Sequence, residues 1–432
     1  MTREHDVTTI LIRGGRIIDP SQGIDRVGTL ALEGQRIVGI DVPVENADTV
    51  IDANGLIVCP GLIDLHVSLR EPGNEEDETI ATGTGAALAG GMTSVACMPD
   101  TSPVVDNRAE AEFILIQGER AGNTHVYPLG AVTKDCAGEE LAEIGQLVEA
   151  GVRAFTDARQ PVVNAEIMRR ALQYAAMFDR PIFNRPQVPE LVQNGVMHDG
   201  FTSTRLGLRG MPAAAENIMV GRDIALTELT GGRTHLMCIS TRNAVEQIRR
   251  AKEQGIRVSA EVAVHQLALT DERLGTFDAN YKVNPPLRTR EHIEALIEGL
   301  RDGTLDVICS DHQPHAPEKK MRELDLVPFG IVGLETLLPL CVQTLIEPGH
   351  LTWPQLIEKL TTGPARVLAI DRGTLQAGKP ADVTLIDPAA RWRVDPTHFR
   401  SKSQNTPFAG WELQGRADTV IVNGQIRYRA SR

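Results

Sequence analysis

The sequence predicts an α/β fold in which a TIM-type (β/α)8 barrel is joined to a smaller domain made of strands. Between residues 61 and 364, short apolar strands alternate with helical segments eight times, which is typical of a closed parallel barrel. Residues 1–60 and 365–432 contain short strands separated by turn signals such as Gly14-Gly15. Because the two ends of the chain have the same character, we expect them to pair into one composite β-sandwich beside the barrel.

The elements follow from local patterns along the chain. The first strands are short apolar or β-branched runs that end at turns, at residues 8–15, 16–19, 29–32 and 36–40. The barrel strands are nearly continuous apolar runs, as expected for strands covered on both faces, at residues 61–69, 93–99, 126–132, 152–157, 181–184, 234–240, 258–262 and 305–311. Helical periodicity places helices at 79–89, 107–121, 139–150, 165–178, 213–230, 244–254, 291–301, 334–345 and 353–361. Strands return at 381–387 and 419–426.

The composition restricts the class of protein and its partners. The chain has 432 residues, of which 42% are hydrophobic, so it can bury a large core. Its formal net charge of −13 makes nucleic acid and anionic membranes poor partners. The six cysteines include no Cys-x-x-Cys pair, which is typical of reduced thiols. Since the sequence has no apolar run of roughly 18 residues and no signal-peptide pattern, we expect a cytoplasmic protein.

The most informative stretch is Gly61–Gly73, in which a buried strand ends in polar side chains. His66, Ser68 and Arg70 alternate with apolar residues, so the period of a strand points all three to one face. A histidine beside an arginine at a strand end suits a site for an anionic substrate. The structural alternative is a histidine in the core and an arginine at the surface, and this stretch does not decide between them.

This stretch resembles the first barrel strand of the dihydroorotase and hydantoinase branch of the amidohydrolase superfamily. In active members that strand ends in His-x-His-x-x-Arg-Glu-Pro-Gly, and both histidines bind zinc. Segments 282–288, 311–315, 328–335, 365–388 and 401–424 also resemble dihydroorotases, so the resemblance covers essentially the whole chain. It implies the same barrel and composite β-sandwich.

The resemblance implies a zinc site that is changed in this chain. Active dihydroorotases hold two zinc ions that share a hydroxide, and two of the ligand positions are kept here as His66 and Asp311. Asp311 also occupies the position of the general acid–base residue, which is vestigial if no metal is bound. The other ligand positions hold residues of a different type, namely Ser68, Ala158, Arg185 and Cys238.

The replaced residues set the expected electrostatics of the site. Arg185 would bring a permanent positive charge to the vacated position, where it would repel a metal ion and pair with Asp311. Cys238 either binds zinc as a thiolate or is a small buried apolar residue. A catalytic zinc needs about three protein ligands and an open position. We therefore expect no cofactor, with zinc present only if the altered site still binds metal.

Four positions resemble those that bind substrate in the family. Arg70 matches the arginine that holds a substrate carboxylate, and His315 matches a second carboxylate-binding position. Asn284 matches a residue that contacts the pyrimidine ring. Asp100 replaces an asparagine, and its charge would repel an acidic substrate or neutralise Arg70. Taken singly, Asn284 is also explained as a turn residue before two prolines and His315 as a loop cap.

Three functions follow from these observations. The first is a non-catalytic dihydroorotase homologue that acts as a structural or regulatory partner of aspartate carbamoyltransferase, the partner that the resemblance implies. The second is an active dihydroorotase, converting carbamoyl-aspartate to dihydroorotate with an altered metal site. The third is a module that senses a small acidic pyrimidine precursor without chemistry. We also expect a homo-oligomer.

Overall fold

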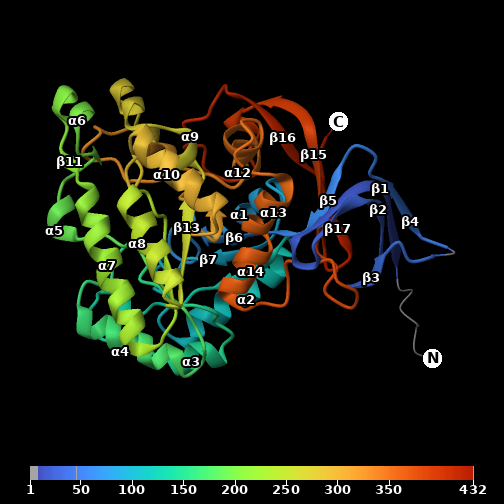
Figure 1. Cartoon of the computed structure of the whole chain (residues 1–432), viewed down its shortest axis with the longest axis horizontal. Coiled ribbons are helices and arrows are strands. Elements are labelled where there is room, and N and C mark those ends of the chain that lie inside the picture. Colours follow the sequence, from blue (N-terminus) through green and yellow to red (C-terminus); the bar gives the residue numbers. More distant parts are fainter. Residues whose placement is uncertain (1–7, 45, 432) are drawn as a thin grey trace.

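The computed structural model describes residues 8–44 and 46–431. Helices surround a barrel of parallel strands in one part of the molecule, and the strands of both chain ends form a separate domain beside it (Figure 1). Among the helices of these residues, none is long and apolar enough to cross a membrane. The architecture confirms the predicted α/β fold with a TIM-type barrel.

Seven strands and one extended segment close the barrel. The strands are β6 (Leu62–Val67), β7 (Met92–Cys97), β8 (His125–Pro128), β9 (Ile182–Asn184), β12 (Thr234–Leu236), β13 (Val258–Ala263) and β14 (Val307–Cys309). Their pairings are parallel. Phe155 continues the ring between β8 and β9, because it bridges to Gly130 on one side and to Ile182 on the other. His312 closes the ring after β14 by bridging to Val67 of β6.

The barrel is covered by helices that lie where helical periodicity predicts them (Figure 1). The main ones are α1 (Ile80–Ala89), α2 (Arg108–Ala121), α3 (Ile144–Glu149), α4 (Ala165–Ala176), α7 (Ala213–Thr230), α8 (Arg242–Glu253), α10 (Arg290–Arg301), α12 (Leu337–Cys341), α13 (Trp353–Leu360) and α14 (Thr362–Leu368). Helix α8 illustrates the cause: Thr241 caps its first turn, and Val245 and Ile248 lie on one buried stripe. Shorter helices in the loops are α5 (Pro189–Val192), α6 (Phe201–Leu206), α9 (His265–Ala268) and α11 (Pro317–Lys320).

The strand domain combines both ends of the chain, as predicted. Its strands are β1 (Thr9–Asp19), β2 (Ile24–Glu33), β3 (Arg36–Ile40), β4 (Thr49–Asp52), β5 (Ile57–Pro60), β15 (Val383–Arg393), β16 (Glu412–Val422) and β17 (Gln425–Arg429). One sheet runs in the order β17-β16-β15-β5-β1-β2-β3, and β4 pairs with β1. Leu385 of β15 pairs with Val58 of β5, and Ile12, Leu30 and Val383 share one buried core. Neither end could bury this face alone.

The boundary between the two domains is clear at the first crossing and shifts at the second. β5 ends at Pro60 and β6 begins at Leu62, as the predicted boundary after residue 60 requires. The predicted boundary between residues 364 and 365 falls inside α14, however. Val367 and Leu368 of this helix pack in the same buried cluster as Leu65 of the barrel. The barrel domain therefore extends through α14, because these side chains cover the apolar end of the ring.

The interior of the barrel separates an apolar floor from a polar rim. Ile63, Leu65, Ala96, Phe183 and Val307 belong to one buried cluster within the ring. Polar side chains follow at the carboxyl ends of the same strands, which is where sites form in this class of barrel.

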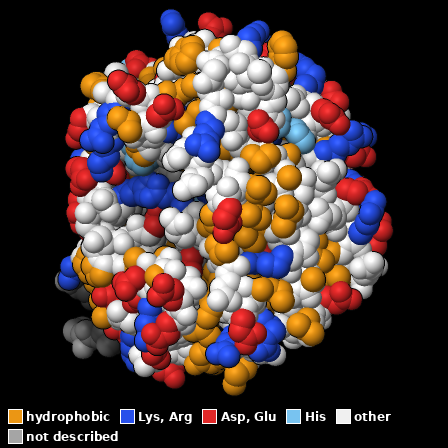
Figure 2. Space-filling view, turned by 90° about the vertical axis from the view of Figure 1, so that its left-hand side faces the viewer, with side chains coloured by type: hydrophobic (Ala, Val, Ile, Leu, Met, Phe, Trp, Pro, Cys, Tyr) orange, Lys and Arg blue, Asp and Glu red, His pale blue; other side chains and the backbone are white. Residues whose placement is uncertain are grey.

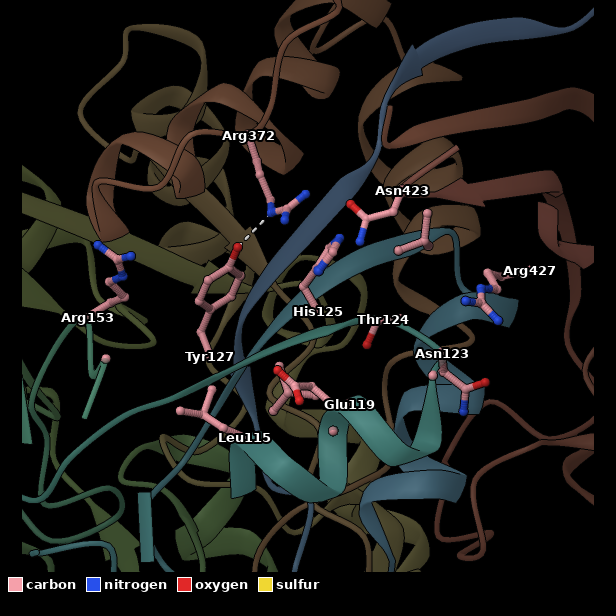
Figure 3. Close-up of a pocket in the computed structure, with 15 residues that line it drawn as sticks. Leu115, Glu119, Asn123, Thr124, His125, Tyr127, Arg153, Arg372, Asn423 and Arg427 are labelled. Carbon is pink, nitrogen blue, oxygen red and sulfur yellow. Dashed lines mark hydrogen bonds between the residues drawn. The ribbon is translucent and has the colours of Figure 1, made fainter. Parts of the chain in front are cut away.

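A hollow of about 480 Å³ lies at the junction between the barrel and the strand domain (Figure 3). It surrounds the start of β8, at the end of the barrel opposite to the carboxyl ends of the strands. Two of its lining residues, His125 and Arg372, contact the same carboxylate, that of Asp382. Arg372 donates from Nε to Tyr127 Oη at 2.7 Å and pairs with Asp382, and Asp382 Oδ1 lies 3.3 Å from His125 Nε2. These contacts link the start of β8 to the strand domain, and we assign this hollow a structural role.

The end of the molecule away from the strand domain carries hydrophobic side chains in the middle of its face (Figure 2). Leu191 of α5, Phe201 of α6 and Ile218 of α7, which lie on this side, are exposed by 42%, 81% and 57%.

Candidate active site

The candidate site is formed by side chains from most of the barrel strands. The carboxyl ends of parallel strands meet at one end of a barrel, so residues far apart in sequence come together there. The residues concerned are His66 of β6, Ser68 and Arg70 after it, Asp100 after β7, Ala158 after the Phe155 segment, Arg185 after β9, Cys238 after β12, Glu261 of β13, Cys309 of β14 and Asp311 after it. All but Asp100 are buried.

A cavity of about 490 Å³ opens over these strand ends. Its polar lining residues are Asp100, Thr101, Asp157, Arg159, Gln160, Arg185, Gln187 and Asn284. Several of them are charged, and the arrangement of those charges decides which ligands suit the cavity.

Asp100 joins two arginines at the rim. Arg70 Nη1 donates to Asp100 Oδ2 at 3.0 Å, and Arg159 Nη2 lies 3.3 Å from the same oxygen. Burial raises the pKa of Asp100, but the two guanidinium groups outweigh it and hold the pKa below its usual value. Asp100 therefore neutralises Arg70, one of the two outcomes expected from the sequence, while Arg159 adds a second positive charge.

Arg185 occupies the centre of the site. Its Nη2 lies 3.6 Å from Asp311 Oδ1, and its Nη1 donates to the carbonyl oxygen of Asn284 at 2.5 Å. Within residues 8–44 and 46–431, Arg185 Nε and Nη2 have no hydrogen-bond partner, although both are buried. Arg159 and Arg185 line the cavity together with Asp100 and Asp157, so the charges of its lining balance, and the Arg185 N–H groups that lack acceptors among the described residues are the feature that suits an anionic ligand.

Asp311 faces two histidines as well as Arg185. Its Oδ1 lies 3.3 Å from His66 Nε2, and its Oδ2 lies 3.9 Å from His265 Nε2. Burial lowers the pKa of His265 to about 4, against the opposing effect of Asp311, so this ring is neutral near pH 7. Asp311 also has a positive φ of 49°, a backbone conformation that is costly for aspartate and often found at functional sites.

The other nitrogen of His66 faces a group of possible metal ligands. His66 Nδ1 lies 2.8 Å from Glu261 Oε1 and 3.3 Å from Cys238 Sγ. Together with Cys309, these residues place four donor atoms within 4.8 Å of one another. Burial lowers the pKa of His66, but Cys238 and Asp311 outweigh it and raise the pKa well above its usual value. The expectation that no cofactor is present is therefore weakened.

The remaining predicted residues are distributed around this centre. Ser68 Oγ donates to Asp100 Oδ1 at 3.4 Å. Ala158 lines the cavity with a methyl group, while the neighbouring Asp157 accepts hydrogen bonds from the backbone of residues 132 and 133. The Asn284 side chain exchanges two hydrogen bonds with that of Gln187, and both residues line the cavity.

His315, predicted to hold a second carboxylate, makes a different contact. Its Nε2–H donates to the carbonyl oxygen of Phe329 at 2.8 Å, and it is not among the residues that line the cavity. Burial, followed by the nearby Arg70, lowers its pKa to about 3, so the ring is neutral near pH 7. His315 thus holds the backbone at Phe329, and its contact with a substrate carboxylate stays a prediction.

Comparison with known proteins assigns the family. Residues 190–427 match the amidohydrolase family, and residues 55–244 match the group described as dihydro-orotase-like. A dihydroorotase of Syntrophotalea carbinolica is 51% identical over 98% of this chain and 99% of its own length. The chain belongs to the dihydroorotase-like amidohydrolases. A dihydroorotase of Pelotomaculum thermopropionicum is 50% identical over 96% of this chain and 98% of its own length.

Solved structures of other proteins share the fold. The L-hydantoinase of Arthrobacter aurescens superimposes with a TM-score of 0.88, covering 99% of this chain and 97% of its own, at 23% sequence identity. A dihydropyrimidinase from Brevibacillus agri gives a TM-score of 0.83, covering 98% of this chain and 95% of its own, also at 23% identity. At this level of identity the likeness supports the barrel and the adjoining strand domain only.

The family assignment corrects the first functional expectation. Relatives that are 47–51% identical over nearly the full length are dihydroorotases, a name that denotes an enzyme. The prediction of a non-catalytic homologue is therefore wrong, whereas the association with aspartate carbamoyltransferase stays a prediction. The first of these relied on ligand positions taken one by one and missed the donors that other strands supply.

The residues present fit one metal ion better than the pair that the family resemblance implies. Ser68 and Ala158 offer no strong ligand, and the guanidinium of Arg185 stands next to Asp311. One soft divalent ion has suitable donors in His66, Cys238, Glu261 and Cys309.

Sequence reasoning missed four residues of this site: Arg159, Glu261, His265 and Cys309. Two of them left a signal. Glu261 is a charged residue within an apolar strand, and a buried charge requires a partner. Cys309 immediately precedes the Ser310-Asp311 end of its strand, so it faces the same part of the barrel. Arg159 and His265 lie in loops, where no periodicity indicates their direction.

Proposed function

We propose that this protein is an active dihydroorotase, a cyclic amide hydrolase that interconverts carbamoyl-aspartate and dihydroorotate. The similarity to the Syntrophotalea carbinolica dihydroorotase, 51% identical over 98% of the chain, carries the proposal. The N–H groups of Arg185 at the cavity that have no partner among the described residues support it, because both the substrate and the product are carboxylates that could accept their hydrogen bonds.

In this proposal the rim binds and orients the substrate. Arg159 is accessible beside Asp100, and Arg185 has two N–H groups without partners in the described part of the chain, so both would donate to substrate oxygens. Arg70 is held by Asp100 and would contribute through its remaining N–H groups. The amides of Asn284 and Gln187 would exchange their mutual hydrogen bonds for bonds to the ring amide.

Asp311 would move the proton. In the hydrolytic direction it accepts a proton from the water that attacks the ring carbonyl and returns it to the amide nitrogen that leaves. His66 on Oδ1 and Arg185 beside it hold the carboxylate in place, while Oδ2 has no hydrogen-bond partner among the described residues. A divalent ion held by His66, Cys238, Glu261 and Cys309 would supply Lewis-acid chemistry when bound only where one of these donors gives its position to a substrate oxygen.

A direct assay tests this proposal. Purified full-length protein, supplied with zinc, should interconvert dihydroorotate and carbamoyl-aspartate, and Asp311→Asn should lower kcat by about 10²–10⁴-fold with a smaller effect on KM. Glu298→Gln on the exposed face of α10 is the matched control and should leave both constants unchanged. Wild-type protein that binds dihydroorotate without turning it over would favour the sensor alternative and contradict the enzyme.

Association with aspartate carbamoyltransferase and self-association stay predictions. For self-association we propose the face that carries Leu191, Phe201 and Ile218, since exposed apolar side chains are typical of contact surfaces (Figure 2).

A further inference from the structure

The donor cluster below the cavity has the dimensions of a metal site. Cys238 Sγ lies 3.3 Å from His66 Nδ1 and 3.6 Å from Glu261 Oε1, and all four donor atoms lie within 4.8 Å of one another. A tetrahedral ion with bonds of roughly 2.0–2.3 Å places its ligands about 3.3–3.8 Å apart. His66 Nδ1 and Glu261 Oε1 lie closer, at 2.8 Å, so these two side chains would move apart by about 0.5 Å for the four donors to surround one ion.

The groups behind these donors are also those that a metal site needs. Metal-bound histidines commonly use their second ring nitrogen to contact a carboxylate, which fixes the ring. Here Asp311 Oδ1 lies 3.3 Å from His66 Nε2, on the far side of the ring from the cluster. Glu261 has a similar support, because its Oε2 lies 3.3 Å from His235 Nε2 and the other nitrogen of His235 lies 2.9 Å from Ser259 Oγ.

The backbone holds the two thiols toward the same point. Cys238, two residues after the end of β12, has a positive φ of 47°, a conformation that is uncommon for residues other than glycine. Cys309 is the last residue of β14, and the two cysteines pack together with Ala263. Each of the four residues comes from a different barrel strand or strand end, so the closed ring itself assembles the site.

We propose that this protein binds a single thiophilic divalent ion through His66, Cys238, Glu261 and Cys309, with Asp311 acting as the carboxylate that orients His66 and not as a metal ligand. Cys309 and Glu261 are the ligands that distinguish this arrangement from the pair of ions that the resemblance implied. Two thiolates favour zinc, cobalt(II) or cadmium over magnesium and manganese. The adjacent Arg185 disfavours a second cation on the Asp311 side.

The inference deepens the proposed function but is tested separately from it. Four protein donors complete a tetrahedral shell, which is typical of sites that stabilise a fold. Protein that binds one ion through thiolates and shows no turnover would contradict the proposed function and leave this inference standing. Protein that turns over substrate with two ions, or with manganese bound through oxygen donors, would support the proposed function and contradict this inference.

Cobalt(II) titration of the metal-stripped, reduced full-length protein is the test. One equivalent should bind, with the visible bands of tetrahedral cobalt and a thiolate-to-cobalt charge-transfer band, and zinc should displace it. Cys238→Ser and Cys309→Ser should each reduce the charge-transfer intensity per bound cobalt to about half, since one of two thiolates is lost. Glu261→Gln should keep that band while weakening cobalt binding by about tenfold or more.

Cys341→Ser is the matched control, because Cys341 is equally buried but lies in α12 outside the cluster. It should leave the spectrum and the stoichiometry unchanged, and circular dichroism should confirm that all variants are folded. An unaltered spectrum in Cys309→Ser, two equivalents of cobalt, or no charge-transfer band in the wild type would each overturn the inference. A thiol count showing that Cys238 and Cys309 resist reduction as a disulfide would overturn it as well.

Discussion

At the scale of single residues, the site depends on how charges share partners. Asp100 contacts both Arg70 and Arg159, whereas the guanidinium of Arg185 is only partly paired. A buried guanidinium with free N–H groups is costly unless a ligand supplies acceptors. This arrangement therefore gains stability when an anion binds, and it makes the arginines separable by experiment.

Arg159 should act mainly in substrate binding. Its side chain is 39% exposed at the cavity, and its Nη2 lies 3.3 Å from Asp100 Oδ2. Replacing Arg159 with Met removes one cation from the rim, so we expect KM for dihydroorotate to rise about tenfold, equivalent to roughly 1.4 kcal/mol, with a small change in kcat. Arg108→Met on α2, where the arginine pairs with Glu112 at the surface, is the control. A tenfold fall in kcat with an unchanged KM would contradict this role.

Arg185 and Asp311 should be coupled in stability. Both are buried and their charged atoms lie 3.6 Å apart. Arg185→Met leaves the buried negative charge of Asp311 without its cationic partner. Breaking such a buried ion pair lowers the free energy of unfolding by on the order of 3–5 kcal/mol. Adding Asp311→Asn should recover part of the loss, because the stranded charge is removed. Urea unfolding of both single variants and the double variant measures the coupling, and simple additivity would mean that the two side chains do not interact.

At the scale of elements, the site requires helices and loops to approach one another closely. Gly90 ends α1 where the segment after β14 crosses it, and a β-carbon there would lie 2.1 Å from the carbonyl oxygen of Leu334. The clashing atom belongs to the backbone of Leu334, so a change of side-chain rotamer cannot relieve the clash. The approach fixes α1 against the segment that follows Asp311.

Gly90→Ala should therefore destabilise the fold. We expect a loss of about 1–3 kcal/mol from overpacking, measured by urea or thermal unfolding. Gly275→Ala is a matched control, because a β-carbon at residue 275 meets nothing within 4 Å and the backbone there has no positive φ. If Gly90→Ala were as stable as Gly275→Ala, the approach of α1 to Leu334 would be looser than described.

At the scale of the whole molecule, the carboxyl group of Glu335 links the barrel to residues 400 and 401, which precede the last strands of the strand domain. Glu335 Oε1 accepts hydrogen bonds from the backbone N–H of Arg400 at 2.8 Å and of Ser401 at 3.2 Å. Burial raises the pKa of Glu335 to about 7, although these two N–H groups oppose the shift. The folded protein thus favours the protonated form.

This raised pKa predicts a pH dependence of stability. A carboxyl whose pKa is higher in the folded state contributes most below its unfolded value of about 4.3, and the contribution is lost as pH rises through 7. Glu335→Gln keeps an acceptor but cannot ionise. It should match the wild type near pH 5 and exceed its stability near pH 8 by on the order of 2 kcal/mol. Urea unfolding at both pH values, with the exposed Glu347→Gln as control, measures this, and an equal difference at both pH values would refute it.

The sequence by itself determined the architecture and part of the site. Alternating strands and helices specified the barrel, and the similar strand patterns of the two ends specified the composite strand domain, because both patterns are local and repeat many times. The motif around His66 and the strand end at Asp311 located the site, since residues at strand ends of a parallel barrel converge.

Only the tertiary structure decided which donors meet. His66 and Glu261 are 195 residues apart in sequence, and their contact requires the ring to close. Which nitrogen of His66 faces Cys238 and which faces Asp311 depends on the packing of the ring between strands, and no sequence pattern records it. For the same reason, reading ligand positions singly predicted a site without metal, whereas the folded barrel brings four donors to one point.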